Sequence, residues 1–132
     1  MEERVFTRAT EEREAWKKIL GVLEQENIFQ KNKLAEMLKA HEKDCNEKLL
    51  DILERYQSEF LQQDEAFKIM WNDLASLERS IEKGASKPAL DVTRMNCSQD
   101  KLRGEIKNLQ MHFNQLKTGF RAFFEEFTEV QL

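Results

Sequence analysis

The sequence predicts an all-α protein, an elongated coiled coil or helical hairpin that assembles into an antiparallel helical bundle. The first indication is that apolar residues recur every three or four positions over most of the chain, which is the period of one helix face. The second is that only four Gly and one Pro occur in 132 residues, so few positions favour a break in a helix. The third is that 35% of the residues are charged and 40% are hydrophobic, which is typical of long amphipathic helices.

The first element that we expect is a long coiled-coil helix over residues 10–83, preceded by a frayed N-terminus over residues 1–9. Thr10 suits the N-cap because its hydroxyl can accept a hydrogen bond from the first turn, and several glutamates follow it. Gly84 can provide the left-handed residue that ends a helix, and Pro88 opposes its continuation. Such a helix would be about 110 Å long at a rise of about 1.5 Å per residue.

The next elements are a loop over residues 84–96 and a second, shorter coiled-coil helix over residues 97–131. Asn96 followed by Gln99 resembles a capping box. From Leu102 onward the apolar residues of the second helix alternate steps of four and three, a heptad pattern that favours left-handed supercoiling with a partner helix.

The simplest fold places the second helix antiparallel to the last third of the first helix, over residues 50–83. The apolar residues of these two segments would then form the core of the hairpin. The predicted core consists of Met70, Leu74, Leu77, Ile81, Leu102, Ile106, Leu109, Phe113, Leu116, Phe120, Phe123 and Phe127.

In that hairpin the first part of the long helix, over residues 11–49, has no partner within the chain, although it contains many apolar residues, including Ile28 and Phe29. A large apolar surface exposed to water promotes aggregation, so another chain is expected to cover it. We therefore predict a homodimer or homotetramer, with other coiled-coil proteins as further candidate partners. The predicted oligomer interface consists of Trp16, Leu20, Leu23, Leu34, Leu38, His41, Cys45, Leu49, Ile52, Tyr56, Phe60 and Phe67.

No sequence motif indicates chemistry, so we expect no catalytic residue, no cofactor and no metal ion. His41 and Cys45 have the spacing of two metal ligands on one helix face, but two ligands do not make a site. No CxxC or HExxH motif occurs. Gly104 and Gly119 lie inside the second helix off its apolar stripe, where they could mark either a close helix approach or a local bend.

Charge and hydropathy exclude two classes of partner. The formal net charge is −4, which disfavours direct binding to nucleic acid or to an anionic membrane surface. No apolar run approaches the length of a transmembrane helix, and the N-terminus lacks the apolar core of a secretory signal. These features predict an intracellular protein, either cytoplasmic or nuclear.

Two stretches carry a resemblance to a known family: YQSEFLQQDEAFKIMW at residues 56–71 and QLKTGFRAFFEEF at residues 115–127. They are similar in texture to Cor1-type coiled coils of the meiotic chromosome axis, and this resemblance implies filament assembly through bundle ends. From the residues themselves we expect a non-enzymatic structural scaffold that self-associates and recruits partners. The alternatives are a chromosome-axis-like filament former and a regulatory adaptor that forms a hetero-coiled coil with a different protein.

Overall fold

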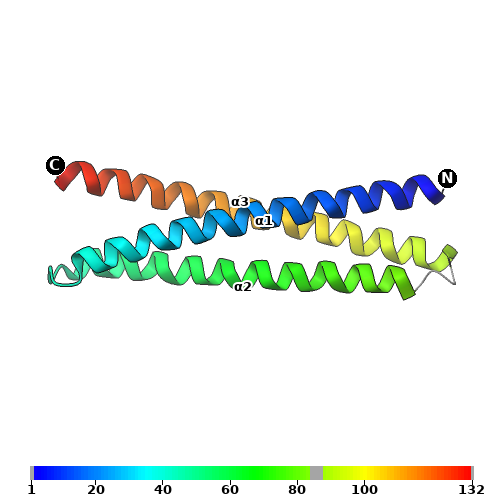
Figure 1. Ribbon diagram of the computed structural model, residues 1–132, viewed down its shortest axis with the longest axis horizontal. Coiled ribbons are helices and arrows are strands. Elements are labelled where there is room, and N and C mark those ends of the chain that lie inside the picture. The colour runs from blue at the N-terminus through cyan, green and yellow to red at the C-terminus, as the bar shows by residue number, and fades with distance from the viewer. Residues whose placement is uncertain (1, 84–87, 132) are drawn as a thin grey trace.

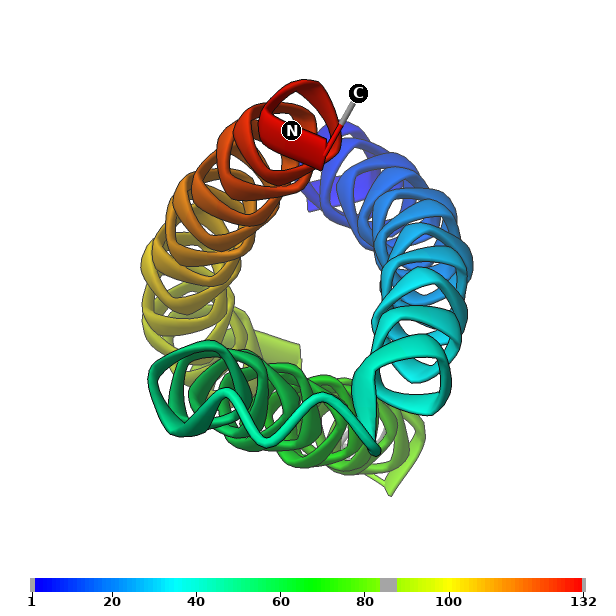
Figure 2. The ribbon, with the colours of Figure 1, turned by 90° about the vertical axis from the view of Figure 1, so that its left-hand side faces the viewer.

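Three long helices form a bundle in the computed structural model, which describes residues 2–83 and 88–131. Helix α1 spans Glu2–His41, α2 spans Glu47–Lys83 and α3 spans Pro88–Gln131. Helix α2 runs antiparallel to both α1 and α3, so the two ends of the chain lie at opposite ends of the bundle (Figure 1). Viewed along its length, the bundle shows the three helices winding around one common axis (Figure 2). The prediction of an all-α helical bundle is thus confirmed.

The predicted continuous helix over residues 10–83 is instead two helices, because the chain turns back between His41 and Glu47. The backbone N–H of Asp44 donates to the carbonyl of His41 (3.2 Å), and Cys45 adopts a positive φ of 53°, a conformation that ends helices. Asn46 then caps α2, since its side-chain oxygen accepts a hydrogen bond from the backbone N–H of Leu49 (3.2 Å).

The ends of the other helices also differ from the predictions. Helix α1 already begins at Glu2, so residues 2–9 are helical rather than frayed and Thr10 lies within the helix. Helix α3 begins at Pro88, so the part of the predicted loop from residue 88 to residue 96 is helical, and residues 84–87 lie outside the described residues. Proline suits the first turn of a helix because its missing N–H would have had no intrahelical partner there.

One apolar core runs along the axis of the bundle. Its largest fully buried side chains are those of Phe60, Phe67, Phe113 and Phe120. The rings of Phe60 and Phe120 pack edge to face with 5.3 Å between centroids, and those of Phe67 and Phe113 do so at 5.8 Å. Burying a phenylalanine contributes about 1.5–3 kcal/mol, and edge-to-face packing adds about 0.5–1.5 kcal/mol per pair. Aromatic contacts between α2 and α3 are therefore a major source of stability.

Polar contacts set the register of α1 against its two neighbours. On the α2 side, the Lys31 ammonium lies 2.7 Å from the carboxylate of Asp64, and the Trp71 indole N–H donates to Glu24. On the α3 side, Glu12 pairs with Arg103 at 2.7 Å and Glu26 pairs with Lys117 at 3.1 Å. Both of these α1–α3 pairs join residues that are 91 positions apart, so the parallel helices keep a single register along this stretch.

Candidate functional site

Most of the residues predicted to form an oligomer interface belong to the core of a single chain. Trp16, Leu20, Leu23, Leu34, Leu49, Phe60 and Phe67 are buried there. Leu38, His41, Ile52 and Tyr56 are half-buried, and Cys45 is exposed in the turn. Because α1 packs on α2 and α3, the argument that a second chain must cover these residues no longer holds.

The residues predicted to form the hairpin core lie in the same core. Met70, Leu74, Leu77, Leu102, Ile106, Leu109, Phe113 and Phe120 are buried. Ile81, Leu116, Phe123 and Phe127 are half-buried and pack against them. The structure thus joins the two predicted sets into one three-helix core.

His41 and Cys45, which have metal-ligand spacing in the sequence, are separated by the turn between α1 and α2. The Nδ1 atom of His41 lies 2.5 Å from a carboxylate oxygen of Asp44, and its ring packs edge to face on Phe127 at 4.9 Å. Among the described residues, no group of three or more His, Cys, Asp or Glu side chains is placed to hold a metal ion. His41 is therefore a packing and turn residue in this structure.

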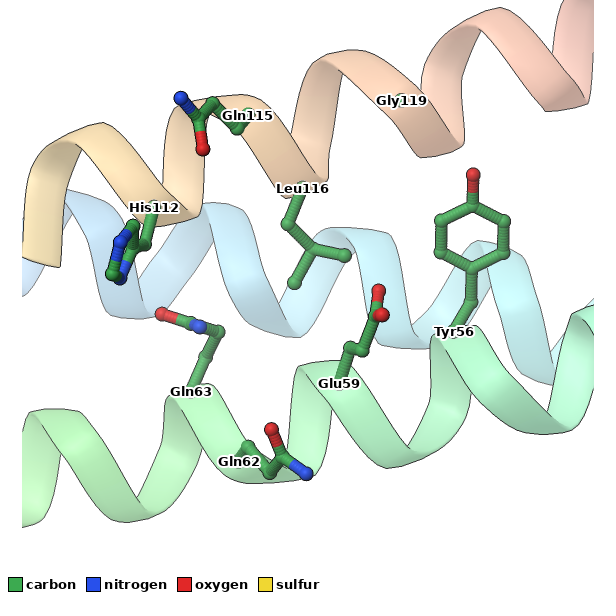
Figure 3. Close-up of a pocket in the computed structure, with 8 residues that line it drawn as sticks. All are labelled: Tyr56, Glu59, Gln62, Gln63, His112, Gln115, Leu116 and Gly119. Atoms are coloured by element: carbon green, nitrogen blue, oxygen red, sulfur yellow. The ribbon is translucent and has the colours of Figure 1, made fainter.

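A polar groove of about 410 Å³ lies between α2 and α3 (Figure 3). It is lined by Tyr56, Glu59, Gln62, Gln63, His112, Gln115, Leu116 and Gly119. His112 lies at one end of this row and Tyr56 at the other, with Glu59 next to Tyr56 (Figure 3). Burial raises the pKa of the Tyr56 hydroxyl, which disfavours a phenolate.

One of the two glycines inside α3, Gly119, lines this groove. A Cβ atom at Gly119 would lie 3.6 Å from the Tyr56 hydroxyl oxygen, an ordinary van der Waals distance, so this contact does not require glycine. A Cβ atom at Gly104 would have no neighbour within 4 Å, and no contact within the chain accounts for that glycine.

Helix α1 carries polar residues on the face that points into the bundle. Its buried positions alternate steps of four and three residues, and three of them hold Arg13, Asn27 and Gln30. The amide nitrogen of Asn27 donates to a carboxylate oxygen of Asp64 at 2.6 Å and to the backbone carbonyl of Phe60 at 3.4 Å. Sequence reasoning missed these inward polar positions, although their heptad spacing continues that of Trp16, Leu20 and Leu23.

The opposite face of α1 carries exposed apolar residues. Val22 is 58% exposed, Ile28 45% and Phe29 56%. We call this surface the α1 outer face and define it by residues Gly21, Val22, Gln25, Ile28, Phe29, Asn32 and Ala35. Glu24, Glu26 and Lys31 flank it, and each contacts α2 or α3 through a hydrogen bond or ion pair. The Lys33 ammonium lies over the Phe29 ring, 4.7 Å from its centroid. The residues of the α1 outer face are themselves uncharged, which makes it the candidate interaction surface.

Gly21 lies on the α1 outer face without a role in packing inside the chain. A Cβ atom built there would meet nothing within 4 Å. Glycine in a helix interior costs about 1 kcal/mol relative to alanine, and no contact within the described chain offsets that cost. A glycine on an exposed helix face permits another backbone to approach closely.

Comparison of the chain with protein-family models, with curated protein sequences and with solved structures finds no match. None of the helices, over the residues that the structure describes, is both long enough and apolar enough to cross a membrane.

Proposed function

We propose that this chain is a non-enzymatic assembly protein, a three-helix module that self-associates through the α1 outer face. The observation that carries the proposal is the mixed polarity of both faces of α1. This helix buries Arg13, Asn27 and Gln30 while it exposes Val22, Ile28 and Phe29. An amphipathic helix that served only its own bundle would carry these apolar side chains on its inner face.

The position of the exposed residues supports contact with another helix. Val22 and Phe29 lie seven residues apart, which is two helical turns, so they project from the same side of α1. Ile28 widens this strip, and Gly21 permits close approach. Association would remove these side chains from water, and burial of apolar area is worth about 25 cal/mol per Å².

The test is light scattering after size exclusion, over a concentration series, on the wild type and on Val22→Ser/Phe29→Ser. Both side chains are more than half exposed, so we expect the double variant to fold as the wild type does. The wild type is expected to gain mass with concentration toward a dimer, and the double variant is expected to remain monomeric.

The matched control is Ile69→Ser on α2, because Ile69 is 57% exposed and lies on a different helix. This control is expected to associate as the wild type does. A wild type that stays monomeric at every concentration would contradict the proposal, and so would a double variant that dimerises with wild-type affinity.

A further inference from the structure

The charges around the α1 outer face specify how two copies would meet, an inference that rests on the proposed self-association. At the N-terminal side, Glu14 and Lys18 project outward from α1. At the C-terminal side, Glu36 and Lys39 also project outward, and Lys39 has the same heptad position as Lys18. Each of these four side chains is exposed, and together they bracket the uncharged outer face.

Three of the four charges have no ion-pair partner within the described chain, namely Lys18, Glu36 and Lys39. The fourth, Glu14, pairs only with Lys17 one turn further along α1 at 2.9 Å, and its side chain remains 58% exposed. By contrast, Glu12 and Glu26, which lie on the α3 side of α1, pair with Arg103 and Lys117. The bracketing charges are therefore available to another molecule.

We infer that the α1 helices of two copies pair antiparallel about a two-fold axis near residue 27, and that these four charges select the pairing. In this arrangement Lys18 is level with the partner's Glu36, and Glu14 is level with the partner's Lys39. The two-fold axis repeats both contacts, as an isologous interface requires. The paired segments extend over about 40 Å at about 1.5 Å per residue.

The same register brings the uncharged residues together between the charges. Phe29 of each copy becomes level with the partner's Gln25, beside the partner's Gly21, where no Cβ atom obstructs the ring. Val22 becomes level with the partner's Asn32. Val22 and Phe29 thus face uncharged residues of the partner, and the charges meet at both ends.

A parallel pairing of the same two faces would be repulsive. It would place Glu14 against the partner's Glu14 and Lys39 against the partner's Lys39, and it would oppose the other two charges in the same way. Like charges across an interface disfavour that arrangement, so the charge order along α1 favours the antiparallel one.

The test is a charge reversal followed by its compensation, with the dimer dissociation constant measured by sedimentation equilibrium at low ionic strength. Lys39→Glu places two acidic residues opposite each other at both ends of the interface. We expect it to weaken the dimer about tenfold, with a smaller effect at high salt. The double variant Glu14→Lys/Lys39→Glu restores opposite charges and is expected to regain an affinity close to that of the wild type.

The control is Arg79→Glu, which makes the same change of charge at an exposed position of α2. It is expected to leave the dissociation constant unchanged. A dimer that is insensitive to Lys39→Glu but disrupted by Val22→Ser/Phe29→Ser would overturn the antiparallel pairing while leaving the proposed function intact. If Glu14→Lys/Lys39→Glu dimerises no more tightly than Lys39→Glu alone, the antiparallel pairing would also be overturned. A wild type that remains monomeric would contradict both the antiparallel pairing and the proposed self-association.

Discussion

Helices α1 and α2 pack side by side, yet only the inner face of α1 includes buried polar side chains. The inner face of α2 is dominated by Phe60, Phe67, Leu74 and other apolar side chains. The inner face of α1 interleaves apolar residues with Arg13, Asn27 and Gln30. The outer face of α1 carries a larger share of the exposed large hydrophobic residues than that of α2.

The difference indicates a division of roles. Apolar contacts are non-directional, so α2 supplies burial without fixing how its neighbours slide along it. Hydrogen bonds require defined donors and acceptors, so the inner polar groups of α1 fix its register on both neighbours. Because α1 is held partly by directional contacts, it can present apolar side chains to another molecule.

The largest expected effect lies in the α2 core. Phe60 is fully buried, and its ring contacts both Tyr56 and Phe120. Phe60→Ala is expected to lower the free energy of unfolding by about 3–5 kcal/mol, because it removes buried area and leaves a cavity. Urea denaturation followed by circular dichroism measures this change.

The adjacent Leu61 is the control, since it is 52% exposed. Leu61→Ala is expected to change the free energy of unfolding by no more than about 0.5 kcal/mol. If both variants lose the same free energy of unfolding, Phe60 does not face the core and Leu61 does not face the solvent as described.

A smaller loss is expected from the inner polar face of α1. Asn27→Ala removes the donor to Asp64 and to the Phe60 carbonyl, and it is expected to lower the free energy of unfolding by about 1–2 kcal/mol. Lys31 still pairs with Asp64, which limits the loss. Asn32→Ala makes the same substitution at an exposed position of α1 and is expected to be nearly neutral. Denaturation midpoints that coincide for the two variants would mean that Asn27 does not stabilise the register.

The apolar stripe predicted much of the core correctly because α2 and α3 follow it. Leu102, Ile106, Leu109 and Phe113 are buried as the heptad pattern predicts. In α2 and α3 the strongest apolar residues coincide with the inner face, so periodicity alone identifies that face. The same reasoning identified only part of the inner face of α1, where polar residues interrupt the stripe.

The turn between α1 and α2 could not be predicted from periodicity. His41, Cys45 and Leu49 continue the helical spacing through it, and it contains neither Gly nor Pro. The available signal was Asn46, a good N-cap residue followed by the acidic Glu47. Cys45 adopts the left-handed conformation although it is not one of the residues that favour it, so its sequence does not indicate the turn.

Identifying the α1 outer face also requires knowing which residues of α1 point into the bundle and which point outward. The sequence alone places Ile28 and Phe29 in the same group as the other apolar residues of the segment 11–49, all of which are expected to be covered by another chain. In the structure Trp16, Leu20 and Leu23 are buried in the core of the bundle, whereas Ile28 and Phe29 are exposed. The apolar residues of α1 can be divided into these two groups only when its buried polar residues are known. The tertiary contacts of the folded chain reveal those polar residues, and the sequence does not.

The smallest expected effect concerns Glu12, at the end of α1 that pairs with α3. Hydrogen bonds from Arg103 hold the pKa of the Glu12 carboxyl below its ordinary value of 4.5, and Gln99 donates a further one. A carboxyl whose pKa is lowered on folding stabilises the folded state above pH 4.5, and this contribution is lost as the pH falls through the lower, folded pKa.

Because both side chains are partly exposed, Glu12→Gln is expected to lower the free energy of unfolding by only about 0.5–1 kcal/mol at neutral pH. Urea denaturation at neutral pH and at several values below 4.5 should show that the difference in stability from the wild type narrows with acid. The control is Glu11→Gln, which changes an exposed neighbour and is expected to alter stability little at neutral pH. A difference that stays constant down to acid pH would mean that the Glu12–Arg103 contact does not contribute through its charge. The α1–α3 register would then depend on other contacts, such as the hydrogen bond that Arg13 donates to the side-chain oxygen of Gln99 (3.1 Å).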